Sequence, residues 1–197
     1  MRLFLLVLSV AVFVWSGIHP HDRFTWILEV FPAIIAGIVL LATYRRFRLS
    51  NLLYALIAIH AMILMIGGKY TYAQVPLGFW MQEWFGFARN HYDRIGHFAQ
   101  GFVPAIAARE ILIRVARYRR DRWLYFIIFC ICLAISALYE LLEWSVAAMT
   151  GTAADAFLGT QGDVWDTQKD MLMAAIGAIT ALIVLPRLHD RSMEKVG

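Results

Sequence analysis

The chain has 197 residues, of which 61% are hydrophobic and only 16% are charged, and its mean hydropathy is +0.64. A soluble domain is expected to carry about a quarter charged residues, so this composition excludes an ordinary water-soluble fold. The net charge of +4 comes from short basic clusters between apolar runs. Such clusters are typical of membrane topology signals and not of a surface that binds nucleic acid.

The apolar runs are numerous enough for about six membrane-spanning helices. We expect an all-α, polytopic transmembrane bundle that forms a single integral membrane domain over 1–197, with spans near residues 3–18, 24–43, 52–67, 95–113, 123–148 and 171–185. A signal peptide behind Arg2 is the alternative for the first run. No small-x-small cleavage site follows that run, so an uncleaved helix is favoured. Cys130 and Cys132 lie inside one run and are interpreted as small hydrophobes, not as a disulfide framework.

The distribution of lysine and arginine predicts the orientation of these spans. If the amino terminus is cytoplasmic, twelve basic residues fall on the cytoplasmic side and five on the outer side. The cytoplasmic group is Arg2, Arg45, Arg46, Arg48, Arg114, Arg117, Arg119, Arg120, Arg122, Arg187, Arg191 and Lys195, and the outer group is Arg23, Lys69, Arg89, Arg94 and Lys169. Both termini are therefore expected in the cytoplasm. The aromatic-rich connection 68–92 is expected to lie along the outer membrane–water interface.

Acidic residues from distant segments are expected at one depth near the outer surface. Asp93 and His97 fall in the first turns of the fourth span. Glu140 and Glu143 lie about 25 and 30 Å along the fifth span, at 1.5 Å per residue. The last span begins beside Asp163, Asp166 and Asp170, and Glu29 lies a turn or two inside the second span. Carboxylates are costly in hydrocarbon and rarely face lipid, so this gathering predicts a functional site.

A structural explanation exists for some of these residues. Asp163, Asp166 and Asp170 also suit the amino-terminal end of a helix, and Asp93 also suits a cap. Glu140 and Glu143 are far from a helix start, and their structural alternative is pairing with Arg94 or His97. Function is the favoured interpretation for this pair.

Two kinds of chemistry fit such a group of side chains. Carboxylates with one imidazole suit a divalent cation such as Mg²⁺, Mn²⁺ or Ca²⁺. Alternatively, low dielectric and mutual repulsion keep some of the carboxyl groups protonated for acid–base catalysis or a proton relay. The spacing does not decide between them, and the chain contains no HExxH, P-loop, GxSxG or paired CxxC motif.

Other polar and small residues are easier to interpret. His60 stands alone in the third span, while His19, His21, His91 and His189 are expected in loops, exposed to water. Small residues recur at helical spacing in the fourth and sixth spans, which permits close helix approach and predicts that both helices are central members of the bundle. They are Gly101, Ala105 and Ala108 in the fourth span and Ala174, Gly177, Ala178 and Ala181 in the sixth.

Three blocks of sequence resemble a known family. They are Arg89–Phe98 (RNHYDRIGHF), Tyr139–Trp144 (YELLEW) and Leu158–Asp163 (LGTQGD), the last continuing to Asp166 and Asp170. In this order they are similar to the YjdF-like bacterial inner-membrane proteins, and the likeness covers essentially the whole chain. More distantly the chain resembles VanZ-like membrane proteins, which implies a shared polar set of Asp93, His97, Glu140, Asp163 and Asp166. Glu143 stands where that pattern has glutamine, and Asp170 where asparagine is common.

Together these features predict a multi-pass protein of the bacterial inner membrane with an acidic and histidine-containing pocket on its periplasmic side. We expect Asp93, His97, Glu140 and Glu143 to be catalytic, and Asp163, Asp166 and Asp170 to hold a divalent cation such as Mg²⁺. The leading hypothesis is metal-assisted or acid–base chemistry on an envelope lipid or lipid-linked substrate. An ion- or proton-coupled transporter and a non-catalytic structural bundle are the alternatives. The lipid bilayer is the expected partner, and nucleic acid is not.

Overall fold

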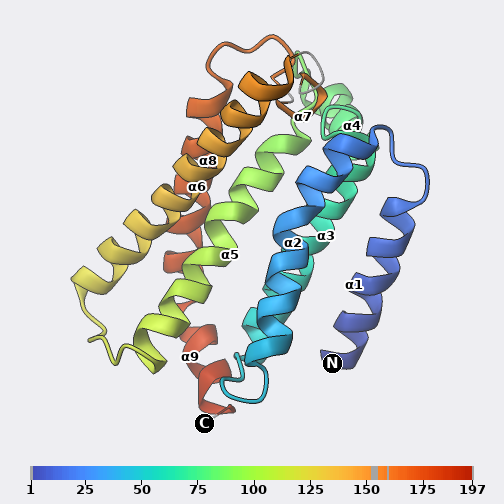
Figure 1. Cartoon of the computed structure of the whole chain (residues 1–197). Helices are drawn as coiled ribbons and strands as arrows, with labels where there is room; N and C mark the ends of the chain where they lie inside the picture. The colour runs from blue at the N-terminus through green and yellow to red at the C-terminus, as the bar shows by residue number, and fades with distance from the viewer. Residues whose placement is uncertain (1, 152–154, 159, 197) are drawn as a thin grey trace.

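A computed structural model describes residues 2–151, 155–158 and 160–196 of the chain. Within these ranges the protein is all-α, with long helices that run alternately up and down and no strand (Figure 1). The long helices are α1 (Arg2–Gly17), α2 (Arg23–Thr43), α3 (Asn51–Tyr70), α5 (Tyr92–Arg114), α6 (Arg122–Thr150) and α8 (Asp166–Val184). The two ends of the chain lie at the same end of the bundle.

Four of the described helices are long and apolar enough to cross a membrane, namely α2, α3, α6 and α8. Helix α1 is apolar but only 16 residues long. Helix α5 is 23 residues long but carries charged residues at both ends. Large apolar side chains cover the outside of the bundle, including Leu41, Leu142 and Ile183, which are 72%, 62% and 74% exposed. The expected polytopic helical membrane protein is confirmed at this level.

Polar caps fix where several helices begin. The side chain of Asp22 accepts a hydrogen bond from the backbone N–H of Thr25 at 2.6 Å at the start of α2. Ser50 caps α3 in the same way, and Asp121 caps α6. Each cap satisfies backbone donors that have no partner inside the helix, which places the helix start next to a polar residue.

Helix α5 is the centre of the bundle and packs against α8, α6 and α3. Its closest neighbour is α8, because glycines on both helices remove the side chains between them. A Cβ atom on Gly101 would overlap the carbonyl oxygen of Ala174, and one on Gly177 would overlap that of Phe98. The close helix approach that the small residues permit is therefore confirmed.

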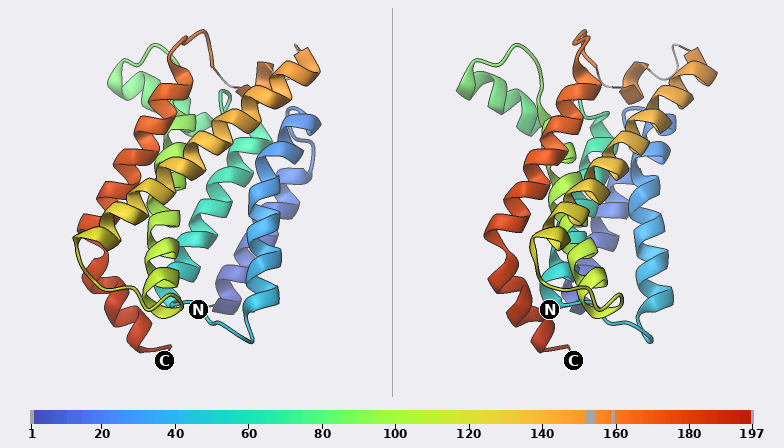
Figure 2. Two further views of the ribbon diagram at one scale, coloured as in Figure 1. Left: turned by 60° about the vertical axis from the view of Figure 1, so that its left-hand side comes forward. Right: turned by 90° about the vertical axis from the view of Figure 1, so that its left-hand side faces the viewer.

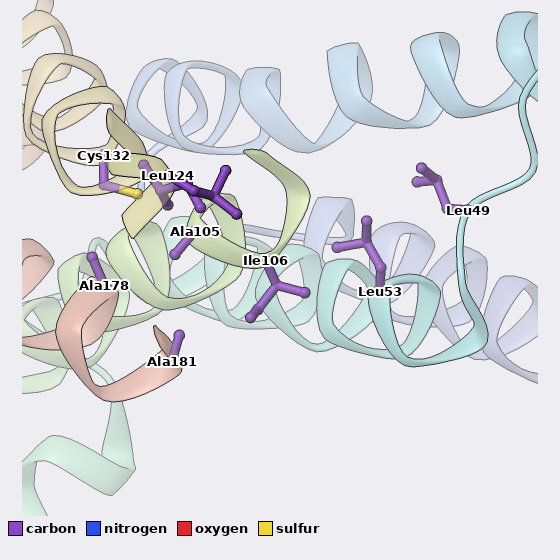
Figure 3. Close-up of a cluster of buried hydrophobic side chains, with 9 residues drawn as sticks. Leu49, Leu53, Ala105, Ile106, Leu124, Cys132, Ala178 and Ala181 are labelled. Atoms are coloured by element: carbon purple, nitrogen blue, oxygen red, sulfur yellow. The ribbon is translucent and has the colours of Figure 1, made fainter. Parts of the chain in front are cut away.

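The buried apolar core joins α3, α5, α6 and α8 with the loop before α3 (Figure 3). It consists of Leu49, Leu53, Ala105, Ile106, Leu124, Ile128, Cys132, Ala178 and Ala181. Cys132 is buried in this core and Cys130 is exposed, and both are free thiols. The burial of Cys132 among apolar side chains agrees with its interpretation as a small hydrophobic residue. Helix α6 crosses the bundle obliquely, while α2 lies on another side (Figure 2).

Short helices close the two ends of the bundle. Helix α4 (Pro76–Phe85) lies in the aromatic-rich connection at one end, and Trp84 and Phe85 on it are exposed. The short helix α7 (Asp155–Leu158) lies at the same end and packs against α6 and α2. At the other end, α9 (Pro186–Glu194) follows α8 after a sharp change of direction at Pro186. The sequence pattern did not predict α4 or α9 as helices, because both are shorter than a membrane span.

Candidate functional site

His97 is the meeting point of three helices. Its Nε2 lies 3.4 Å from Asp93 Oδ1, one turn earlier on α5, and 3.7 Å from Asp170 Oδ1 on α8. Its Nδ1 lies 3.0 Å from Gln100 Oε1 and 3.7 Å from Glu140 Oε1 on α6. The ligand atoms of Asp93, His97 and Asp170 all lie within 4.8 Å of one another. The imidazole is thus 94% buried and surrounded by carboxylates.

A second group of charges covers this site at the end of the bundle. We call it the outer network, and it consists of Arg89, Arg94, Lys169, Asp163, Asp166 and Asp170. Arg94 is its central cation and contacts all three aspartates, with Asp163 Oδ2 3.5 Å from its Nη2. Lys169 Nζ lies 2.7 Å from Asp163 Oδ2, and its hydrogen bond holds the pKa of the Asp163 carboxyl below its usual value. These aspartates are therefore already paired with cationic side chains.

The charges differ between the outer network and the residues beneath it. In the described part of the chain, the outer network sets three cationic side chains against three carboxylates. The residues beneath, which we call the inner cluster, are Glu29, Asp93, His97, Glu140 and Glu143. They set four carboxylates against one imidazole. Because like charges in a buried site are unfavourable, the inner cluster needs protons or an external cation to coexist.

One acceptor of the inner cluster has no hydrogen bond. Glu140 is only 6% exposed, and its Oε1 is buried with no hydrogen-bond partner among the described residues. A buried oxygen without a partner costs about 1–3 kcal/mol, so natural proteins keep few of them. This atom lies 3.7 Å from His97 Nδ1, so the free acceptor position belongs to the same site.

A cavity of about 410 Å³ extends from the inner cluster between α2, α3, α5 and α6. Its polar end is formed by Glu29, Asp93, His97, Tyr139 and Glu143, and the Tyr139 hydroxyl donates to Glu29 Oε2 at 3.4 Å. The remaining walls are mainly aliphatic. On α5 they reach from Asp93 to Ile111, which corresponds to about 27 Å of helix. The imidazole of His60 lines the cavity partway along, and its buried Nε2 has no partner among the described residues.

The structure places the sequence-predicted residues in two different surroundings. Asp93, His97 and Glu140 lie together in the inner cluster, and Glu143 lines the same cavity. Asp163 and Asp166 lie in the outer network instead, and Asp170 is shared between it and His97. The three acidic groups expected to hold a cation thus contact arginine and lysine. The set with metal-ligand spacing is Asp93, His97 and Asp170.

The cationic partners of these aspartates are not evident from the sequence pattern. Arg89 precedes α5 and Arg94 lies in its first turn, and the sequence pattern uses Arg89 only as an orientation signal. Arg94 was considered as a partner for Glu140 and Glu143, but its partners are the aspartates at the start of α8. Its place beside Asp93 in a membrane span was the available signal, because a charge at that position needs a buried partner.

A second buried polar group at the opposite end of the bundle was also missed. Glu110 Oε2 lies 2.9 Å from His189 Nε2, and Arg109 lies 3.0 Å from His189 Nδ1 and 2.8 Å from Asp190. The expectation that His189 is solvated is wrong, since it is fully buried. The physical reason is that α9 folds back onto the ends of α3 and α8. Arg109 and Glu110 inside an apolar segment were the signal for such a partner.

Comparison with known proteins identifies the family. The profile described as "Predicted membrane protein (DUF2238)" matches residues 1–191. The chain is 54% identical over 186 residues to the inner membrane protein YjdF of Escherichia coli (strain K12), covering 94% of this chain and 89% of that protein. No solved structure matches the chain. The chain therefore belongs to the DUF2238 family of multi-pass inner-membrane proteins, as the three sequence blocks predicted.

Proposed function

We propose that this DUF2238 protein carries out acid–base chemistry on a lipid or lipid-linked molecule of the bacterial envelope. The observation that carries the proposal is the inner cluster, where four carboxylates and one imidazole end a long apolar cavity. Apolar walls suit an acyl or isoprenoid-like chain, and a few convergent polar groups suit its reacting end. Buried carboxyl groups held close together share protons, which makes them donors and acceptors near neutral pH.

The proposal includes a topology. A single domain over 1–197 crosses the membrane six times through α1, α2, α3, α5, α6 and α8, with both termini in the cytoplasm. The bias of twelve basic residues against five supports this orientation, as does the position of both termini at one end of the bundle. The inner cluster then lies near the periplasmic surface, where a substrate from the outer leaflet can reach it.

Each residue of the site has a proposed role. His97 accepts a proton from the substrate, and Asp93 orients its imidazole and stabilises the charge that forms, as carboxylates do in catalytic dyads. Glu140 and Glu143 are the proton donors, because Glu140 lies 3.7 Å from His97 Nδ1 and Glu143 lines the same cavity. The outer network holds α5 and α8 in register above them through Arg94.

A divalent cation such as Mg²⁺ is the alternative counter-charge. Asp93, His97 and Asp170 would hold it, since two carboxylates and an imidazole suit such an ion. It would relieve the repulsion in the inner cluster and polarise a substrate oxygen. The ion pair of Arg94 with Asp170 competes with this arrangement. For Asp163 and Asp166 to bind the cation as well, both must be released from Arg89, Arg94 and Lys169. We therefore favour acid–base chemistry in which protons, not a metal ion, neutralise the inner cluster.

The test compares envelope lipids by mass spectrometry in a deletion strain and in the same strain complemented with one form of the protein. The complementing forms are wild type, His97→Asn and Glu140→Gln. We expect wild type to convert at least one lipid species. Either variant should convert the same species at least about tenfold less than wild type does. Glu83→Gln, on exposed α4, is the matched control and should behave as wild type. Equal membrane amounts of each variant are required. Identical lipid profiles in all strains would refute the proposal, and one metal ion per purified chain that Asp93→Asn abolishes would select its cation version.

The length of the cavity supports a second candidate, a proton- or ion-coupled transporter. Its walls extend from Asp93 to Ile111 on α5, most of the thickness of a bilayer, and they include His60 partway along. A transporter must open this path from the cytoplasmic side in one state. Single cysteines at Ala36 and Val39, in a Cys130→Ser, Cys132→Ser background, should then be labelled by a membrane-impermeant thiol reagent from either side. Protection from the cytoplasmic side under all conditions contradicts transport.

A further inference from the structure

We infer that the cavity selects an amphiphile whose headgroup is a protonated amine, drawn from the surrounding bilayer. This inference rests on the proposed function for the apolar chain and adds the chemistry of the headgroup. Its basis is the pairing of an aliphatic cavity with a polar end that is rich in carboxylates and has no surplus cation.

The polar end of the cavity holds carboxyl groups that need a counter-charge, which protons or a bound cation can supply. Glu29, Asp93 and Glu143 line it together with His97, and within the described ranges none of the lining residues is a lysine or an arginine. The nearest arginine, Arg94, contacts Asp163, Asp166 and Asp170 in the outer network. A phosphate or carboxylate headgroup would therefore add a further acidic group to a site that has no lysine or arginine to balance it. A protonated amine would supply the counter-charge.

Two phenol rings add to the recognition of a cation. Tyr72 and Tyr139 line the same end of the cavity, and the Tyr139 ring lies 6.4 Å from the His97 ring, centroid to centroid. Tyrosine faces attract ammonium groups, and this attraction is stronger where water is excluded. Glu29 is 4% exposed and accepts a 3.4 Å hydrogen bond from Tyr139, and a carboxyl group has further acceptor positions for an ammonium donor.

The shape of the cavity supports a bilayer molecule over a small soluble amine. Most of its lining is aliphatic, from Ala33 and Leu40 on α2 to Ile57 on α3 and Ile111 on α5. Helices α2 and α6 form opposite walls and, along their described lengths, do not pack extensively against each other. An alkyl chain can therefore reach the cavity between these two helices, with its headgroup at Glu29 and Glu143.

The experiment measures binding of three probes of equal chain length to the purified full chain in a neutral detergent. The probes are dodecylamine, dodecanol and dodecanoic acid, near neutral pH, and the readout is the shift of the thermal unfolding midpoint with probe concentration. We expect dodecylamine to bind at least about tenfold more tightly than dodecanol. Dodecanoic acid should bind the least tightly. Propylamine, which lacks the chain, should produce no comparable shift.

Two variants separate recognition from chemistry. Glu29→Gln should abolish the preference for the amine, while Glu83→Gln on exposed α4 should keep it. His97→Asn removes the proposed base and should leave the order amine, alcohol, acid unchanged. That result, with unchanged lipid profiles in cells, would support the inference and refute the proposed chemistry. Three outcomes would overturn the inference. Dodecanoic acid could bind as tightly as dodecylamine, or propylamine could do so. Alternatively, Glu29→Gln could prefer the amine as strongly as wild type does.

Discussion

Gly101→Ala is expected to lower the stability of the protein more than most single substitutions. The added methyl would overlap the carbonyl oxygen of Ala174 on α8. This oxygen belongs to the backbone of α8, so it cannot move without separating α5 from α8. Overpacking of this kind costs about 1–3 kcal/mol, and we expect the upper end of that range or a failure to fold. The thermal unfolding midpoint in detergent, and the yield of folded protein, measure the effect.

Gly37→Ala is the matched control for this substitution. Gly37 lies within α2, and a Cβ atom there would have nothing within 4 Å. Alanine favours helix over glycine by about 0.5–1 kcal/mol, so Gly37→Ala should leave the midpoint unchanged or raise it. Gly177→Ala should resemble Gly101→Ala, because its Cβ would overlap the Phe98 carbonyl oxygen. A Gly101→Ala protein as stable as the control would mean that α5 and α8 are not held as closely as described.

The fold was largely predictable because its main signals are local. Apolar runs predict the long helices, and small residues at helical spacing predict close helix packing by α5 and α8, which the structure shows to be against each other. Helix α5 illustrates the limit of hydropathy, since its charged ends remove it from the apolar candidates while its middle packs at the centre of the bundle. Helices α4 and α9 were not predicted, because their length does not separate a short surface helix from a loop.

The sequence predicted which residues form the site better than it predicted which cationic side chain contacts which carboxylate. A depth argument from 1.5 Å per residue was enough to bring Asp93, His97 and Glu140 to one level, and the structure brings them together around His97. Which cation meets which carboxylate depends on side-chain directions across three helices, and sequence spacing does not contain that information. For this reason the sequence does not predict that Arg94 contacts the aspartates at the start of α8, and it offers Glu140 and Glu143 as partners of Arg94 instead.

Arg94→Gln is expected to destabilise the protein strongly through the outer network. Arg94 contacts Asp163, Asp166 and Asp170, and the side chains of Asp166 and Asp170 are only 6% and 4% exposed. Removing one partner of a buried ion pair leaves an uncompensated charge and costs about 3–5 kcal/mol. The thermal unfolding midpoint of purified protein checks this, with Arg23→Gln at the exposed start of α2 as the control.

A second substitution separates lost charge compensation from a general loss of packing. In Arg94→Gln with Asp170→Asn, the unpaired aspartate is neutralised, and an amide pair occupies similar volume. If uncompensated charge is the cause, the double variant should be more stable than Arg94→Gln alone, because coupled residues give non-additive free energies of unfolding. Additive losses, or a midpoint for Arg94→Gln equal to that of Arg23→Gln, would contradict the role given to the outer network. Rescue would also show that Asp170 needs a counter-charge beside it, the same requirement that we propose the inner cluster meets with protons.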